Sequence, residues 1–140
     1  MTAVNNKIGS EVAIMWFWWF MVICDLLLPI IMLITGRMMW KHYPKEINGV
    51  LGYRTNRSMK NTDTWKFAHE YCGKLWWKIG AASVVPTILV HIPFFHSDES
   101  TIGIVGGIVA AVQCVIMLAS VFLTERALKK TFNADGTRIA

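Results

Sequence analysis

Three apolar runs, each close to the length of a membrane span, constrain this 140-residue chain more than any other feature. They cover residues 12–35, 75–95 and 102–123. An α-helix needs roughly 20 apolar residues to cross the hydrocarbon of a bilayer. Outside these runs too little apolar sequence remains for a separate water-soluble core. The sequence therefore predicts an all-α integral membrane protein with three transmembrane helices, in a single membrane domain over residues 1–140.

Basic residues are unevenly distributed among the segments that flank the runs. Lys and Arg are frequent at residues 36–74 and in the C-terminal tail, whereas the link at residues 96–101 contains Asp98 and Glu99 and neither Lys nor Arg. Because Lys and Arg are retained on the cytoplasmic side, we expect the N-terminus outside a bacterial plasma membrane, and residues 36–74 and the C-terminus in the cytoplasm. The net charge of +5 then favours contact with anionic lipid headgroups, and no nucleic-acid partner is expected.

The polar segment at residues 44–74 separates the first two runs. Pro44 and the pair Asn48-Gly49 are turn signals, so the first helix is expected to end near Tyr43. Asn61 or the residue after it can cap a new helix. We predict a short amphipathic helix that begins there, lies at the inner membrane surface and turns into the second span at Gly73. Its solvated face would consist of Lys66, Glu70 and Lys74.

The same segment contains an ordered set of residues, namely Pro44, Ile47-Asn48, Gly52-Tyr53-Arg54-Thr55, Ser58-Met59, Trp65, Ala68-His69 and Gly73-Lys74. This combination resembles the signature of the SdpI family, small bacterial membrane proteins named for immunity to a sporulation-delaying peptide toxin. The resemblance implies a multi-helix protein of the bacterial plasma membrane. From the founding member it also implies protection against the toxin, and signalling by holding a transcriptional repressor at the membrane.

We expect this loop to form a surface that binds a partner or lipid. The planar guanidinium of Arg54 suits phosphate or carboxylate, and Arg57 can flank it. Alternatively, Arg54 ties the loop to a helix end or to lipid phosphate. His69 is expected to be a hydrogen-bonded packing residue, or else a pH-sensitive or ligand-contacting group. The candidate residues are Asn48, Gly49, Gly52, Tyr53, Arg54, Thr55, Arg57, Ser58, Trp65 and His69. Candidate partners are the lipid bilayer, a cytoplasmic regulator and a peptide toxin.

A carboxylate, Asp25, interrupts the first apolar run. Counted at about 1.5 Å per residue from Val12, Asp25 lies roughly 20 Å below the outer end of its span, and Gln113 and Ser83 come out at roughly 16 and 18 Å in theirs. These three residues are expected to form an intramembrane polar layer, either to fix helix packing by hydrogen bonds or to carry a proton or ion. His91, at about 6 Å, is expected to be too shallow to pair with Asp25.

The third run carries small residues at four-residue spacing, at Gly103, Gly107 and Ala111. Such a stripe lets helices approach closely. We predict that it is a helix-association face, which meets either another helix of the chain or a second copy in a homodimer.

Motifs for enzymatic chemistry are not found in the sequence, which has neither a nucleophile elbow nor a phosphate-binding glycine loop. The three cysteines lack metal or redox spacing. We therefore expect no catalytic residues, metal or cofactor. Immunity or signalling through the loop is the first functional hypothesis. The alternatives are a small proton- or ion-coupled transporter or channel component that uses Asp25, and a structural membrane assembly protein.

Overall fold

The computed structural model consists of three long helices, and it describes the backbone of residues 2–139 and the side chains of residues 5–139. The elements in chain order are α1 (Thr2–Lys41), α2 (Thr62–His91), a single 3-10 turn η1 (Ile92–Phe94) and α3 (Glu99–Thr131). All three α-helices are long and apolar enough to cross a membrane. The prediction of an all-α protein with three transmembrane helices is confirmed.

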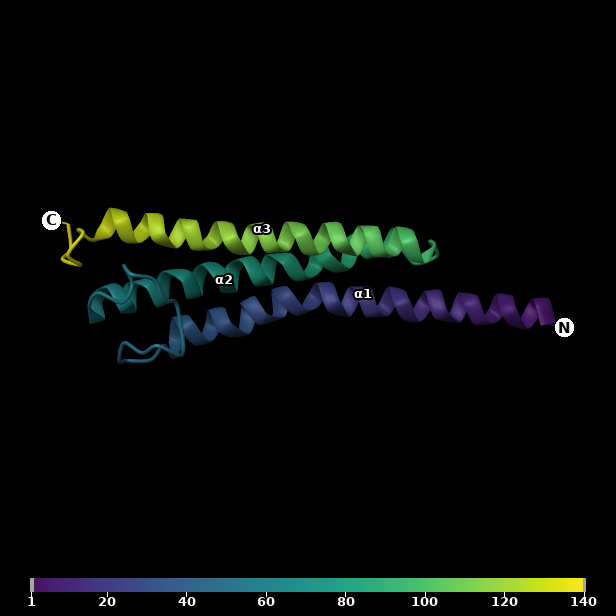
Figure 1. Cartoon of the computed structure of the whole chain (residues 1–140), viewed down its shortest axis with the longest axis horizontal. Helices are drawn as coiled ribbons and strands as arrows, with labels where there is room; N and C mark the ends of the chain where they lie inside the picture. The colour runs from purple at the N-terminus through teal and green to yellow at the C-terminus, as the bar shows by residue number, and fades with distance from the viewer. Residues whose placement is uncertain (1, 140) are drawn as a thin grey trace.

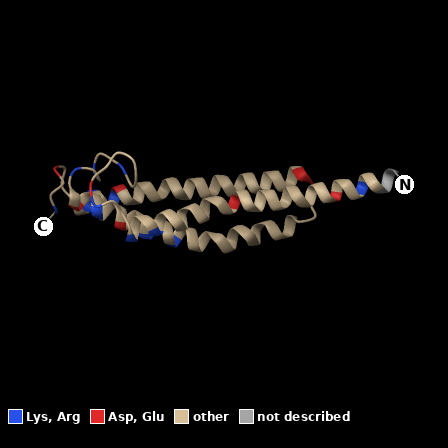
Figure 2. Cartoon of the chain, turned by 90° about the horizontal axis from the view of Figure 1, so that it is seen from below, with Lys and Arg blue, Asp and Glu red and all other residues tan. Residues whose placement is uncertain are grey.

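The helices lie side by side, and consecutive helices run in opposite directions (Figure 1). We call the end that holds the connector 42–61 and the tail 132–139 the loop end, and the end that holds residues 92–98 the turn end. At the turn end α1 extends well beyond the other two helices. Most Lys and Arg residues gather at the loop end, and the middle of the bundle is almost free of charge (Figure 2).

Glycines bring α1 and α2 into contact backbone to backbone. A Cβ added to Gly73 would lie 2.5 Å from the backbone nitrogen of Trp40 and 2.7 Å from the carbonyl oxygen of Gly36. A Cβ on Gly80 would lie 2.7 Å from the carbonyl oxygen of Pro29. These distances leave no room for a side chain, so the α1–α2 contact depends on glycine at these positions.

The predicted interfacial helix is not a separate element. Residues 62–91 form one continuous helix, and Gly73 lies within it, in contact with α1, rather than at a turn. The i, i+4 charges that suggested an interfacial helix are the solvated side of the first three turns of α2. The sequence pattern did not show that this amphipathic stretch and the apolar run share one helix axis.

The start of α2 is fixed by Asn61, as its residue type predicts. Asn61 Oδ1 accepts a hydrogen bond from the backbone N–H of Thr64 (2.8 Å), and the hydroxyl oxygen of Thr64 accepts one from the N–H of Asn61 (3.1 Å). This reciprocal capping box pairs two N–H groups that would otherwise lack partners.

Replacing Asn61 with Ala should lower the free energy of unfolding by about 1–2 kcal/mol, because both the cap and a contact with the tail are lost. The measurement is the free energy of unfolding of the chain in detergent micelles, followed by circular dichroism. Asn56→Ala, at an exposed position of the same connector, is the matched control and should change little. Equal effects of the two substitutions would contradict the role of the cap.

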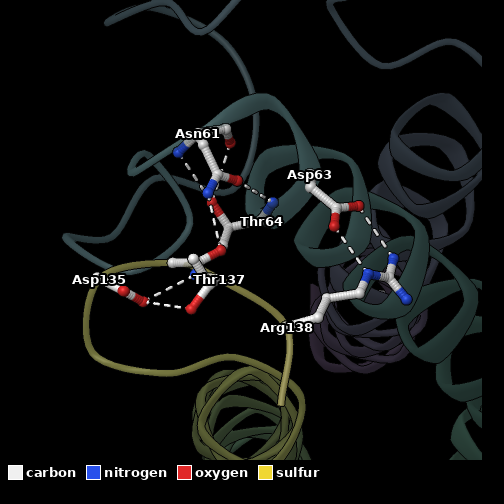
Figure 3. Close-up of polar contacts among 7 residues, drawn as sticks. Asn61, Asp63, Thr64, Asp135, Thr137 and Arg138 are labelled. Carbon is white, nitrogen blue, oxygen red and sulfur yellow. Dashed lines mark hydrogen bonds and ion pairs between the residues drawn. The ribbon is translucent and has the colours of Figure 1, made fainter. Parts of the chain in front are cut away.

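The C-terminal tail folds back onto this cap (Figure 3). Arg138 donates two hydrogen bonds to the carboxylate of Asp63, at 2.7 and 2.9 Å, and Asn61 Nδ2 donates to the carbonyl oxygen of Gly136 (2.8 Å). Only the basic charge of the tail was predicted from the sequence. Its pairing with the start of α2 was not foreseen, because the partners are about 75 residues apart in the chain.

Candidate functional site

The loop signature is organised around the buried imidazole of His69, on α2. The backbone N–H of Tyr53 donates to His69 Nε2 (3.1 Å), and His69 Nδ1 lies 2.8 Å from the carbonyl oxygen of Trp65. Because a backbone N–H can only donate, Nε2 must be the acceptor, and Nδ1 carries the proton and donates to Trp65. His69 is therefore a neutral imidazole that ties the loop to α2.

Gly52 makes this contact possible. Its φ of +105° is in the left-handed region, which residues with a Cβ rarely adopt. A Cβ there would also overlap His69 Nε2. The requirement for glycine at this position therefore comes from both its backbone conformation and its contact with the imidazole.

Tyr53 connects the loop to α3. Its hydroxyl lies 3.2 Å from the carbonyl oxygen of Val121 and 3.1 Å from Glu125 Oε1, and its single proton can be donated to one of them at a time. Burial, together with the neighbouring Glu125 carboxylate, raises the pKa of the Tyr53 phenol above its ordinary value. The phenol therefore stays protonated and remains a donor at neutral pH.

Other members of the signature close the loop from inside. Ser58 Oγ donates to the carbonyl oxygen of Tyr53 (2.9 Å) and accepts from the backbone N–H of Thr55 (2.8 Å). Trp65 is fully buried, and its indole N–H donates to the carbonyl oxygen of Pro44 (2.7 Å). These residues hold the shape of the loop, and their buried side chains are not available to a partner.

The exposed part of the loop is small and apolar at its tip. Val50 and Leu51 are 80% and 64% exposed. Their backbone N–H groups both donate to Asn48 Oδ1, at 3.0 and 2.8 Å, and the Arg54 guanidinium donates to the carbonyl oxygen of Gly49. The tip is thus an ordered turn, fixed by Asn48 from one side and Arg54 from the other.

An apolar groove of about 280 Å³ lies beside the tip, between the loop and the end of α1. Met38 and Tyr43 from α1 and the residues that follow it, Leu51 from the loop, and Trp76 from α2 contribute to its walls. The tip and the groove make one surface.

The structure divides the candidate loop residues into two groups. Gly49 and Arg54 are exposed and Arg57 is half-buried, whereas Tyr53, Ser58, Trp65 and His69 are buried. Val50 and Leu51, which were not among the candidates, are the most exposed apolar residues of the loop. Two consecutive apolar residues directly before Gly52 are the sequence signal for this exposed pair.

The intramembrane acid Asp25 has a partner, His91, that its estimated depth had excluded. His91 Nε2 lies 2.8 Å from Asp25 Oδ2, and the two residues are 0% and 4% exposed. The indole N–H of Trp18 donates to the carbonyl oxygen of His91 (2.9 Å). The expectation that His91 is too shallow to reach Asp25 is wrong.

The depth of Asp25 was counted from Val12, on the assumption that Val12 lies level with the outer ends of the other two spans. The Trp18 contact places the end of α2 level with Trp18 and not with Val12, because α1 projects beyond the bundle. Asp25 is then only about 10 Å along α1 from that level. Side chains also lean toward the N-terminus of their own helix. In antiparallel α1 and α2 this brings Asp25 and His91 toward each other.

Gln113 and Ser83 belong to a different contact. Gln113 Nε2 donates to the hydroxyl oxygen of Thr87 (2.9 Å), and that hydroxyl donates to the carbonyl oxygen of Ser83 (2.7 Å). The polar layer is therefore two contacts, Asp25 with His91 and Gln113 with Thr87. Ser83, Thr87 and His91 are spaced at i, i+4 and i+8, so they share one face of α2. This spacing was the sequence signal for both contacts.

Most of the small-residue stripe of α3 points away from the other described helices. A Cβ on Gly107 would meet no described atom within 4 Å, one on Gly103 would meet only Phe17 at 3.9 Å and beyond, and Ala111 is exposed. Gly106, next to the stripe, makes the close approach instead, since a Cβ there would lie 3.2 Å from Asp25 Oδ2. The stripe is therefore not the main contact between α3 and the other described helices, and its association with a second copy stays a prediction.

Among residues 5–139 there is no cluster of three or more His, Cys, Asp or Glu side chains suited to hold a metal ion. The titratable side chains buried in the bundle are used in pairs or in contacts with the backbone, as for Asp25 and His69. The geometry of these groups offers hydrogen bonding.

Comparison with known proteins supports one assignment. No curated protein and no solved structure matches the chain. A profile of the SdpI/YfhL protein family matches residues 45–124. The match covers more than half of the chain and contains the loop, the whole of α2 and most of α3. The chain is a membrane protein that belongs to the SdpI/YfhL family, as the loop signature predicts.

Proposed function

We propose that the chain acts in antimicrobial-peptide immunity or membrane signalling, through the surface formed by the loop tip and its groove. In the proposed orientation the N-terminus lies outside a bacterial plasma membrane and the loop end lies in the cytoplasm, as the basic residues favour. A cytoplasmic regulator is then the partner that the tip can meet directly. A peptide toxin arriving from outside would act on it only through the helices.

One observation carries this proposal. Val50 and Leu51 are held in the open on a turn whose backbone is fixed by Asn48 and Arg54. An ordered, exposed apolar pair that continues into a groove is typical of a contact surface. The buried members of the signature support it by holding the loop in one conformation.

Replacing both Val50 and Leu51 with Asp should abolish protection or partner recruitment, because two carboxylates would have to be buried on binding. The measurement is survival of cells that express the chain and are challenged with a membrane-active antimicrobial peptide, normalised to the amount of chain in the membrane. Ile139→Asp, at an exposed position of the tail, is the matched control. Unchanged protection by the double variant would refute the proposal.

A photoreactive residue at Leu51 identifies the partner more directly. The side chain of Leu51 is exposed, whereas that of Tyr53 is buried against α3. Crosslinking to one cytoplasmic protein supports signalling, and crosslinking to lipid alone contradicts recognition of a protein.

A second candidate function is a proton- or ion-coupled transporter or channel component, and the Asp25–His91 contact favours it. A carboxyl group and an imidazole at 2.8 Å inside a membrane span can exchange a proton. A structural assembly protein remains the third hypothesis, for which neither the loop nor Asp25 would change anything except the amount of folded chain.

A further inference from the structure

A group of basic and aromatic side chains lies where α1 and α2 touch at the loop end. The two helices are in backbone contact there, since a Cβ on Gly36 would lie 2.6 Å from the backbone nitrogen of Trp77 and 2.9 Å from the carbonyl oxygen of Gly73. Beside this contact lie four exposed cations and two indoles. We call them the cation cluster, which consists of Arg37, Trp40 and Lys41 on α1, and Lys74, Trp77 and Lys78 on α2.

The cations of the two helices converge on one indole. Lys41 Nζ lies 4.2 Å from the centre of the Trp40 ring, and Lys74 Nζ lies 5.8 Å from it. The ring of Trp77 lies 6.3 Å from that of Trp40. Arg37 precedes Lys41 by four residues, and Lys78 follows Lys74 by four, so each shares a helix face with the lysine beside the indole.

The described part of the chain supplies no anion to these cations. The sequence has no Asp or Glu at residues 26–45 or 71–97. Glu70, just before that second range, lies 4.0 Å from Lys66, and no ion pair among residues 5–139 includes a cation of the cluster. Like charges that are held close together repel one another, so the cation cluster favours the binding of an anion.

The cluster also lies at the end of the apolar surface of both helices. It begins where the run 12–35 ends and where the run 75–95 starts, and Trp side chains favour the headgroup level of a bilayer. Toward the middle of the bundle, Ile34 and Ile30 precede Arg37 at i−3 and i−7, and Val85 follows Lys78 at i+7. They are 56%, 42% and 59% exposed. The faces that carry the cations therefore continue as exposed apolar faces.

We propose that the cation cluster binds the headgroup phosphate of an anionic phospholipid. Ammonium and guanidinium groups donate charge-assisted hydrogen bonds to phosphate oxygens, and basic sites between transmembrane helices suit such headgroups. The acyl chains of the lipid lie along the exposed apolar faces. The site is separate from the loop tip, where Arg54 is engaged with the carbonyl oxygen of Gly49, and it does not depend on the proposed function.

Native mass spectrometry of the full chain tests the proposal. The chain is released from neutral detergent micelles that contain equal amounts of phosphatidylglycerol and phosphatidylcholine with the same acyl chains. The ratio of the two lipid-bound forms measures the preference for the anionic headgroup. We expect the native chain to favour phosphatidylglycerol by about tenfold to thirtyfold, since each of the two lysines beside Trp40 contributes about fivefold near an anionic headgroup.

Paired substitutions identify the site. Lys41→Gln with Lys74→Gln removes both ammonium groups beside Trp40 and should reduce the preference to less than threefold. Lys129→Gln with Lys130→Gln is the matched control, because it removes the same charge from exposed positions of α3 at the loop end. It should leave the preference within threefold of the native value. Lys41→Arg with Lys74→Arg keeps the charge and should retain the preference.

A soluble competitor separates lipid from free phosphate. Glycerol phosphate has the same phosphate chemistry without acyl chains, and a large excess of it should not displace the lipid. Displacement would indicate a site for soluble phosphate and would overturn the assignment to lipid.

Circular dichroism checks that each variant is folded, and all four replaced lysines are exposed. Equal retention of the two lipids by the native chain would overturn the proposal. An equal loss of preference in the Lys41/Lys74 and Lys129/Lys130 variants would do the same, because the preference would then follow net charge and not this cluster.

Discussion

Replacing Gly73 with Ala should destabilise the bundle by about 2–3 kcal/mol, although it adds a single methyl group. That methyl would meet backbone atoms of Trp40 and Gly36 at 2.5 and 2.7 Å. Backbone atoms of a packed helix cannot rotate away, so α1 and α2 must separate, and overpacking of this kind typically costs 1–3 kcal/mol. The measurement is the free energy of unfolding in mixed micelles, followed by circular dichroism.

Gly107→Ala is the matched control, since it makes the same chemical change within the apolar part of α3. A Cβ there would meet no described atom within 4 Å, and Ala is a better helix former than Gly by about 0.5–1 kcal/mol. The substitution should be neutral or slightly stabilising. If the two substitutions have the same effect, the backbone contact at Gly73 does not determine the packing.

His91→Leu should cost about 3–5 kcal/mol, the range found when one partner of a buried ionisable pair is removed. The Asp25 carboxyl group would remain inside the span without its 2.8 Å partner. Unfolding in micelles measures the loss. Adding Asp25→Leu to His91→Leu should recover most of it, because the unpaired carboxyl group is then gone. No recovery in the double variant would show that the cost of His91→Leu comes from packing and not from the pair.

Asp25→Asn separates structure from proton chemistry. The amide keeps the size of the carboxyl group and can still hydrogen-bond to His91, so the fold should be retained. A proton- or ion-coupled flux in reconstituted vesicles should disappear if Asp25 carries the proton. Retained flux in this variant would exclude Asp25 as a proton carrier, and loop-mediated protection should be unaffected.

Local patterns predicted the helices well. The three apolar runs, the cap at Asn61 and the loop signature are short-range features that depend on residue type and spacing. They were enough to predict three spans and the family.

Contacts between distant residues were predicted poorly. Asp25 and His91 are 66 residues apart, and Tyr53 and Glu125 are 72 apart, so their meeting depends on how the helices are staggered. A depth count assumes that the outer ends of all spans lie level, and α1 violates that assumption. The direction of the small-residue stripe could not be predicted either, since spacing predicts a narrow face but not the direction in which it points, and its role as an association face stays a prediction.

The continuity of α2 has a mechanical consequence. His69 holds the loop and His91 contacts Asp25, and the two residues lie about 33 Å apart on a single helix. Because α2 is one helix, a displacement at its turn end also moves the residues at its loop end. Pro86 lies between the two histidines, at a residue type where helices commonly bend. Under the proposed signalling function, the stiffness of α2 would decide how much of a displacement at the turn end reaches the loop.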